Sequence, residues 1–150
     1  MEIILAIVVI ILDFFSKIWV KENLPYGVSQ EFWPKLLNLH YTKNTGAAFS
    51  ILTGQRFLLT ALSSLAVVFL ILGRNKIIED NNVMRLIYGL ILGGTCGNLI
   101  DRLLYGYVID FLEFGFFKFP VFNLADSALT LGVFLMVLLL VSELVKGGHQ

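Results

Sequence analysis

Four long apolar segments alternate with polar connections along the chain. They cover residues 3–20, 57–73, 84–104 and 126–145, and each is close to the roughly 20 mostly apolar residues that a helix needs to cross a bilayer. The pattern therefore predicts four transmembrane helices. Because four is an even number, both ends of the chain should lie on the same side of the membrane.

The first connection, residues 21–56, is long and mostly polar. It contains Pro25, Gly27 and Pro34, which are typical of turns, and then an alternation of apolar and polar residues over 37–42 (LNLHYT). An alternation with a period of two predicts a half-buried strand. We therefore expect this segment to form a small sheet outside the membrane.

The last connection, residues 105–125, is dense in aromatic residues. Aromatic rings concentrate at the boundary between lipid and water, so this segment is predicted to lie on the bilayer surface. The short polar stretch 74–82 is typical of a simple connection between two helices. The aromatic residues of the last connection are Tyr105, Tyr107, Phe111, Phe114, Phe116, Phe117, Phe119 and Phe122.

The overall composition is that of a membrane protein. Of 150 residues, 57% are hydrophobic and only 15% are charged, and the mean hydropathy is +0.83, which is too apolar for an ordinary soluble domain. Eleven basic residues balance eleven acidic ones, so the charge does not favour a nucleic-acid partner. We expect one membrane-embedded domain over residues 1–150. Its first segment is predicted to be a retained helix, because Met1 and Glu2 do not form the basic start of a signal peptide.

The basic residues give conflicting indications about orientation. A plain positive-inside count would place the 21–56 connection in the cytoplasm. We discount that count because Lys17 and Arg102 are predicted to lie inside helices, and Lys35 and Lys43 lie far along the connection. The basic residues on or near this side are Lys17, Lys21, Lys35, Lys43, Arg56, Arg102 and Lys118, against Arg74, Lys76, Arg85 and Lys146 on the other.

A row of small residues follows one face of the third predicted helix. Gly89, Gly93 and Gly97 recur every four positions, which lets a neighbouring backbone approach closely. The neighbour could belong to the same chain or to a second copy. In either case the row would bring Asn98, Asp101 and Arg102 against other helices.

Two groups of polar residues within the predicted helices favour ion pairing over chemistry. Asp13 and Lys17 are four residues apart, so they can form an ion pair on one face of the first helix. Asn98, Asp101 and Arg102 share a face of the third helix. There, Asp101 could hold Arg102 in place, or Arg102 could reach neighbouring carbonyl or carboxylate groups.

Asp110 and Asp126 are the strongest candidates for chemistry. Asp110 lies in an apolar run, 108–112 (VIDFL), which would raise its pKa, and Asp126 lies where Asn123 could cap the last helix. If the two carboxylates meet, both cannot ionise, so one stays protonated while the other acts as a base. That is the starting state of an aspartic protease, which needs no metal, cofactor or nucleophilic side chain.

Other hydrolase mechanisms lack the residues they require. The two histidines, His40 and His149, do not form a zinc-binding helix motif, and the chain contains no G-x-S-x-G motif. A serine–lysine dyad is not favoured either, because adjacent residues such as Ser16 and Lys17 point to different faces of a helix.

Five short motifs, taken together and in this order, resemble the bacterial lipoprotein signal peptidase family, also called signal peptidase II. They extend from the first predicted helix to the last. The motifs are Asp13-x-x-x-Lys17, the stretch 44–50 (NTGAAFS), the stretch 97–102 (GNLIDR), the stretch 108–111 (VIDF) and the stretch 122–127 (FNLADS).

The resemblance implies an all-α membrane protein with four transmembrane helices, a small extracytoplasmic β-cradle and a short interfacial helix. It implies a multi-pass protein of the bacterial cytoplasmic (inner) membrane with both termini cytoplasmic and an active site near the outer leaflet. The implied activity is that of an aspartic endopeptidase. It would cleave diacylglyceryl-modified prolipoproteins immediately before the lipidated lipobox cysteine. Its partners would be these substrates and membrane lipids, and we expect a monomer.

By position in the motifs, Asp110 and Asp126 match the catalytic pair of the family. We expect Asn44 and Arg102 to bind substrate carbonyls and Asn123 to orient Asp126. Because Gly46 has no side chain, another backbone could approach it closely. The residues that match substrate-binding or dyad-supporting positions are Asp13, Lys17, Asn44, Gly46, Asn98, Asp101, Arg102, Asn123 and Ala125.

Two other classes of function are compatible with intramembrane carboxylates. In a proton-coupled carrier or channel, Asp101, Asp110 and Asp126 would form a relay. In a non-enzymatic membrane scaffold, replacing an aspartate would change assembly but no chemistry.

Overall fold

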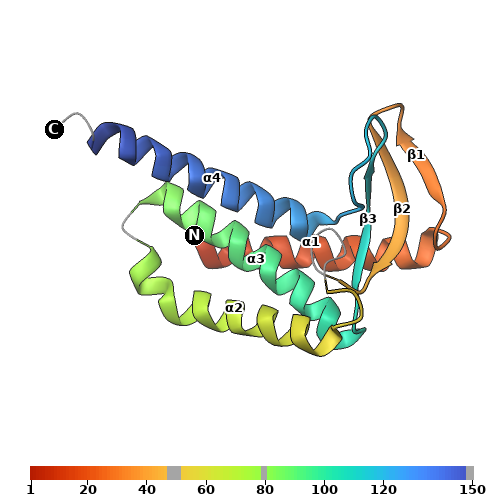
Figure 1. Cartoon of the computed structure of the whole chain (residues 1–150), viewed down its shortest axis with the longest axis horizontal. Coiled ribbons are helices and arrows are strands. Elements are labelled where there is room, and N and C mark those ends of the chain that lie inside the picture. Colours follow the sequence, from red (N-terminus) through yellow and green to blue (C-terminus); the bar gives the residue numbers. More distant parts are fainter. Residues whose placement is uncertain (47–51, 79–80, 148–150) are drawn as a thin grey trace.

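Four long helices run side by side, and a small sheet lies across one end of them (Figure 1). The computed structural model describes residues 1–46, 52–78 and 81–147. The helices are α1 (Glu2–Asn23), α2 (Arg56–Ile77), α3 (Asn82–Leu104) and α4 (Leu124–Gly147). All are long and apolar enough to cross a membrane, and each contains one of the four predicted spans, which confirms the prediction.

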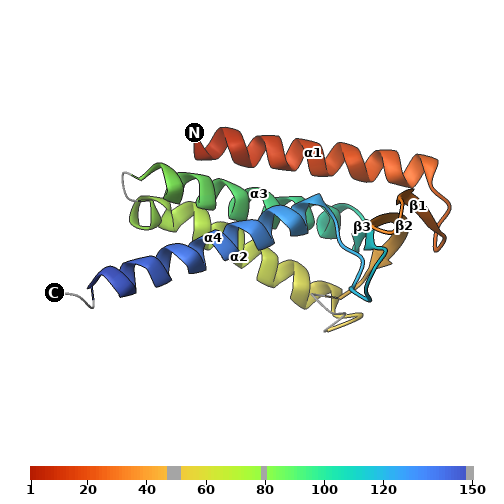
Figure 2. The ribbon, with the colours of Figure 1, turned by 90° about the horizontal axis from the view of Figure 1, so that it is seen from above.

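Helix α3 is the centre of the bundle. It packs against the other three helices, whereas α2 and α4 lie on opposite sides of it (Figures 1 and 2). Half of its most apolar stretch is buried, against 6% for α2. The exposed side chains of α2 are large and apolar, such as Phe57 and Leu72. This surface is therefore suited to contact with lipid.

Glycines allow α3 to approach its neighbours at backbone distance. A Cβ atom added to Gly93 would lie 2.8 Å from the Cβ of Val9 on α1, and one added to Gly97 would lie 2.8 Å from an Asp13 carboxylate oxygen. The predicted glycine row therefore packs against α1 of the same chain. Gly94, which lies outside that row, faces the backbone of α4.

The ends of α1, α2 and α3 away from the sheet are joined by polar contacts. The carboxylate of Glu2, which is buried, pairs with the guanidinium of Arg74 on α2. The hydroxyl of Tyr88 on α3 donates a hydrogen bond to the carbonyl of Leu70 at 2.8 Å. These contacts hold α2, the helix with the least buried surface, against the bundle.

The sheet has three antiparallel strands in the order β1 (Ser29–Trp33), β2 (Leu37–Asn44) and β3 (Val108–Phe114). Strand β2 contains the predicted alternating segment, so that prediction is confirmed. Strand β3 was predicted only as a surface segment. Residues 108–111 are all buried, so they form a continuous apolar run without the alternation that marks a half-buried strand.

The short interfacial helix implied by the family resemblance is not found among residues 1–46, 52–78 and 81–147. Residues 47–50 of the 44–50 motif lie outside the described residues. The aromatic connection after α3 instead contributes β3 and a turn that pairs back onto it, because Leu112 bridges to Phe122.

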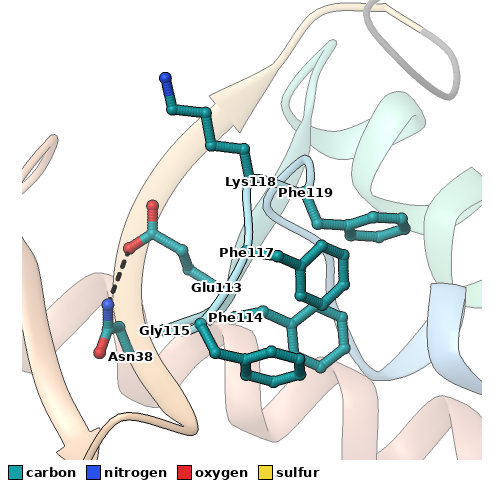
Figure 3. A pocket seen from close by; sticks show the side chains of 8 residues that line it. Asn38, Glu113, Phe114, Gly115, Phe117, Lys118 and Phe119 are labelled. Carbon is teal, nitrogen blue, oxygen red and sulfur yellow. Dashed lines mark hydrogen bonds between the residues drawn. The ribbon is translucent and has the colours of Figure 1, made fainter.

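An aromatic cluster covers the end of β3 farthest from α3. The ring of Phe114 contacts the rings of Phe116, Phe117, Phe119 and Phe122 at centroid distances of 5.0–5.7 Å. Figure 3 shows several of these rings beside a cavity of about 430 Å³, with an amide–carboxylate hydrogen bond from β2 to β3 on its other side. Phe116, Phe117 and Phe119 of this cluster are exposed, and the position of the segment at the bilayer surface stays a prediction.

The close packing of α3 on α4 predicts a penalty for a single methyl group. Gly94→Ala should destabilise the protein by about 1–3 kcal/mol, because the new Cβ would meet the backbone of Ala125 and Leu129. Gly73→Ala on α2 is the matched control. Its Cβ would meet only the flexible end of Ile77, so it should be neutral or stabilise by up to about 1 kcal/mol. Thermal unfolding in detergent, followed by circular dichroism, checks this difference, and equal midpoints for the two variants would contradict it.

Candidate active site

Apart from Glu2, the buried polar residues gather where α1, α3, β3 and the start of α4 meet, next to the sheet. They are drawn from all five sequence motifs, and each is less than 10% exposed except Asp126 and Asn44, which are half-buried. Such a concentration of polar groups at the edge of an apolar bundle requires every member to have a partner. The residues are Asp13, Lys17, Asn44, Asn98, Asp101, Asp110, Asn123 and Asp126.

Lys17 is the centre of this group. Its ammonium lies 2.7 Å from Asp13 and 3.0 Å from Asp101, and it donates a hydrogen bond to the side-chain oxygen of Asn98 at 3.3 Å. The predicted pair of Asp13 and Lys17 is therefore present. Lys17 also binds a second carboxylate, that of Asp101 on α3. The spacing of residues within one helix could not reveal this contact.

The two carboxylates that surround Lys17 also bind backbone. Asp13 accepts a hydrogen bond from the N–H of Ala125 at 2.9 Å, and Asp101 accepts one from the N–H of Ile109 at 2.9 Å. Each of these backbone groups belongs to the residue immediately before one of the two candidate catalytic aspartates. One buried lysine thus indirectly positions both.

The expectation that Asp101 holds Arg102 in place is wrong. Asp101 is occupied by Lys17 and Ile109, and the guanidinium of Arg102 instead donates to the carbonyls of Asn98 at 3.4 Å and Gly46 at 3.3 Å. The physical reason is direction, because adjacent residues on a helix point to different faces. Arg102 therefore faces the β2 side of the site.

Asn123 joins the two candidate aspartates. Its side-chain oxygen accepts from the N–H of Asp126 at 2.8 Å while Asp126 accepts from the N–H of Asn123 at 3.3 Å, which is a reciprocal cap at the start of α4. Its amide nitrogen donates to Asp110 at 2.7 Å and to the side chain of Asn98 at 3.1 Å. The predicted cap is present, and the same residue also fixes Asp110.

Asp110 and Asp126 each have one further amide partner. Asn44 donates to Asp110 at 2.9 Å, and Asn98 donates to Asp126 at 2.7 Å. Burial and then repulsion by Asp126 raise the pKa of Asp110 to about 7, although the amide hydrogen bonds oppose the shift. The structure therefore brings the two carboxylates together and keeps the pKa of Asp110 close to neutral pH.

Both carboxylates face a cavity of about 1060 Å³. Its walls come from α2 and α4, with α3 between them and the sheet at one end. The cavity therefore extends from the aspartates along the helices. Among the residues described, no group of three or more His, Cys, Asp or Glu side chains is arranged to hold a metal ion. The arrangement is suited to acid–base chemistry on an elongated molecule.

Some cavity residues were not predicted from the sequence. Ser63 of α2, Thr95 of α3 and Thr130 of α4 line the part of the cavity that lies between the helices. Each is a hydroxyl residue in an apolar helix and belongs to none of the five motifs, so nothing in the sequence distinguishes it. Gly46 was predicted, and its N–H donates to the side chain of Asn44 at 2.9 Å, which closes a tight turn beside Asp110.

Comparison with known proteins relates the chain to membrane peptidases. The family model described as signal peptidase (SPase) II matches residues 5–142. The lipoprotein signal peptidase of Streptococcus agalactiae serotype Ia is 38% identical over 147 residues, covering 98% of this chain and 96% of the relative. That of a Synechocystis strain is 43% identical over 129 residues, covering 85% and 80%.

The fold is also similar to solved structures. One structure of a bacterial membrane enzyme superimposes with a TM-score of 0.91 at 33% identity, covering 97% of this chain and 90% of that one. A second superimposes with a TM-score of 0.85 at 34% identity, covering 93% and 91%.

The position of Lys17 predicts that its replacement greatly lowers the stability of the protein and that further substitutions recover part of the loss. Lys17→Met should destabilise the protein by about 3–5 kcal/mol, because it leaves Asp13 and Asp101 buried without a cation. Adding Asp13→Asn and Asp101→Asn to the same chain removes both uncompensated charges and should recover part of the loss. Thermal unfolding in detergent measures both changes. A triple variant no more stable than Lys17→Met would contradict the electrostatic explanation.

Proposed function

This chain belongs to the signal peptidase II family, and on that premise we propose that it is a membrane aspartic endopeptidase whose catalytic pair is Asp110 and Asp126. Its activity is removal of the signal peptide from lipoprotein precursors. The observation that carries the proposal is the shared partner of the two carboxylates, since Asn123 hydrogen-bonds to both at the wall of a large cavity.

The pair holds one proton in its working state. The ionised carboxylate removes a proton from a water molecule, whose oxygen attacks the carbonyl carbon of the scissile peptide bond. The protonated carboxylate donates a hydrogen bond to the carbonyl oxygen. When the C–N bond breaks, a proton passes to the leaving amine. The raised pKa of Asp110 supports this scheme, because it keeps a carboxylic acid available near neutral pH.

The remaining motif residues have positioning and binding roles in this scheme. Asn98 and Asn123 orient the carboxylates through fixed amide hydrogen bonds. Asn44 and Arg102 line the cavity on the β2 side, where they can donate to the carbonyls of an extended peptide. Gly46 leaves room for the peptide backbone.

The proposed substrate is a prolipoprotein whose lipobox cysteine carries a diacylglyceryl group, cleaved immediately before that cysteine. Residues of α2 and α4, which both pack on α3, line the cavity, and its wall on α4 includes exposed apolar side chains such as Leu131 and Phe134. The acyl chains could then remain in the bilayer while the peptide reaches the aspartates, where side-chain donors replace water. We propose that the termini are cytoplasmic, that the sheet lies on the outer side of the inner membrane, and that one chain suffices.

A proton-coupled carrier, the other function considered from the sequence, is not favoured. Family membership supports a hydrolase. In addition, Asp101 is engaged with Lys17 and the backbone of Ile109, and it does not line the cavity.

The first test is cleavage of a purified diacylglyceryl-modified prolipoprotein peptide in detergent. Asp110→Asn and Asp126→Asn should each reduce kcat by at least about a hundredfold, because each removes one partner of the acid–base pair without changing its shape. Glu113→Gln is the matched control. It neutralises a carboxylate on the same strand as Asp110, outside the cavity that holds the pair, and should retain activity.

Three results would argue against this proposal. Undiminished cleavage by either asparagine variant would remove that aspartate from the mechanism. Cleavage at any other bond would refute the assigned specificity. A well-folded wild type that cleaves nothing, but carries protons across a vesicle membrane, would favour the carrier.

The pH dependence of cleavage tests the role of Asn44. Activity should fall as the pH rises through the pKa of the protonated carboxylate, because the pair then loses its shared proton. The Asn44 hydrogen bond stabilises ionised Asp110 and lowers its pKa, so Asn44→Ala should move this fall in kcat to higher pH. Asn38→Ala, which removes an amide bonded to Glu113 on the same two strands, should leave the profile in place. A shift of the Asn44→Ala profile to lower pH would contradict the assigned role.

A further inference from the structure

A short turn between α3 and β3 is surrounded by basic side chains from other elements. The ammonium of Lys21, at the end of α1, lies 4.6 Å from the ring centre of Tyr105. The ammonium of Lys43, on β2, lies 5.1 Å from the ring centre of Tyr107. The two rings stack on each other at 5.9 Å, so the two cations flank one aromatic unit.

A third cation contacts the residue between these tyrosines. Gly106 has a φ of +82°, and the guanidinium of Arg56, at the start of α2, occupies the space where a side chain at this position would lie. Three elements that are distant in the sequence thus each place one cation against residues 105–107. We refer to Lys21, Lys43 and Arg56 around this turn as the basic turn cluster.

The cluster is positive and open to the surroundings. Lys21, Lys43 and Arg56 are all exposed, and none of them forms an ion pair with a carboxylate in the described part of the chain. The end of α3 contributes only about half a negative charge through its free carbonyls, which leaves most of the positive charge uncompensated. A ligand with negative charge would be attracted to this position.

The location indicates where that ligand comes from. At the sheet side of the bundle α1 ends, α2 begins and α3 ends (Figure 1), so the cluster lies at the depth where spanning helices leave the bilayer. Tyrosines are typical of this depth, which is also that of lipid phosphates. The same three cations belong to the excess of basic residues that runs against the positive-inside rule, so topology does not explain them.

We propose that the basic turn cluster binds the phosphate headgroup of an anionic phospholipid in the surrounding membrane. Arg56 can donate two parallel hydrogen bonds to phosphate oxygens, and the two ammonium groups add charge from either side. A zwitterionic lipid fits less well because its own cation opposes the cluster. Lys43 also lines the large cavity and adjoins Asn44, so a lipid held here would border the mouth of the candidate active site.

Binding can be measured without any assay of peptidase activity. The full chain in neutral detergent is titrated with phosphatidylglycerol or phosphatidylcholine, and bound lipid is counted by native mass spectrometry. Phosphatidylglycerol should bind more tightly to the wild type. Replacing Lys21, Lys43 and Arg56 together by Gln should weaken its binding about a hundredfold, at roughly fivefold for each basic residue near a lipid surface.

The matched control replaces three exposed lysines outside the cluster, Lys76, Lys118 and Lys146, by Gln, and should retain the preference. Equal binding of the two lipids by the wild type, or equal losses in both triple variants, would overturn the proposal. Competition by inorganic phosphate as strong as that by the lipid would assign the cluster to a soluble anion instead. Unchanged lipid binding combined with a raised KM for prolipoprotein peptide would assign it to an acidic segment of the substrate.

A second variant guards against misfolding of the triple variant. Arg56→Lys keeps the charge and removes the paired donors, so it should weaken binding of phosphatidylglycerol by less than Arg56→Gln does. Equal binding by the wild type and both Arg56 variants would remove Arg56 from the site.

Discussion

The arrangement of the whole site depends on one buried cation. Lys17 is 2% exposed, and a charge so far from water is stable only because Asp13 and Asp101 lie within 3.0 Å of it. The three residues come from two helices, so their pairing fixes α1 against α3. The same carboxylates have a second oxygen or lone pair available, and they use it to bind backbone at the start of α4 and in β3. Through these two carboxylates, Lys17 fixes the positions of the start of α4 and of β3.

This arrangement requires the absence of a side chain on α3. An Asp13 oxygen lies 2.8 Å from the point where a Cβ of residue 97 would be, and the Cβ of Ala125 lies 3.0 Å from it. Gly97 therefore leaves the space through which α1 reaches the start of α4. The glycine row and the polar motifs, which look separate in the sequence, are parts of one packing solution.

Much of this could be predicted from the sequence, for reasons that are local. The four helices follow from the length of their apolar segments, and β2 from its alternation. Strand β3 was not predicted because residues 108–111 are buried on both faces and so show no alternation. The partner of Asp101 was wrongly predicted, because a spacing of one residue suggested Arg102 whereas the actual partner is 84 positions away. Contacts between distant elements leave no periodic signal, so only the family motifs indicated which residues would converge.

The chemistry of the links between Lys17 and the two candidate aspartates distinguishes a peptidase site from a proton pathway. Asn98 accepts from Lys17 and donates to Asp126, and Asn123 donates to Asp110. An amide side chain both donates and accepts hydrogen bonds but does not titrate near neutral pH. A proton shared by the aspartates therefore cannot pass along these amides to the carboxylates around Lys17. Two asparagines thus link the buried ion pairs to the two carboxylates through fixed hydrogen bonds, and neither of them offers a titratable group between the two sets of carboxylates.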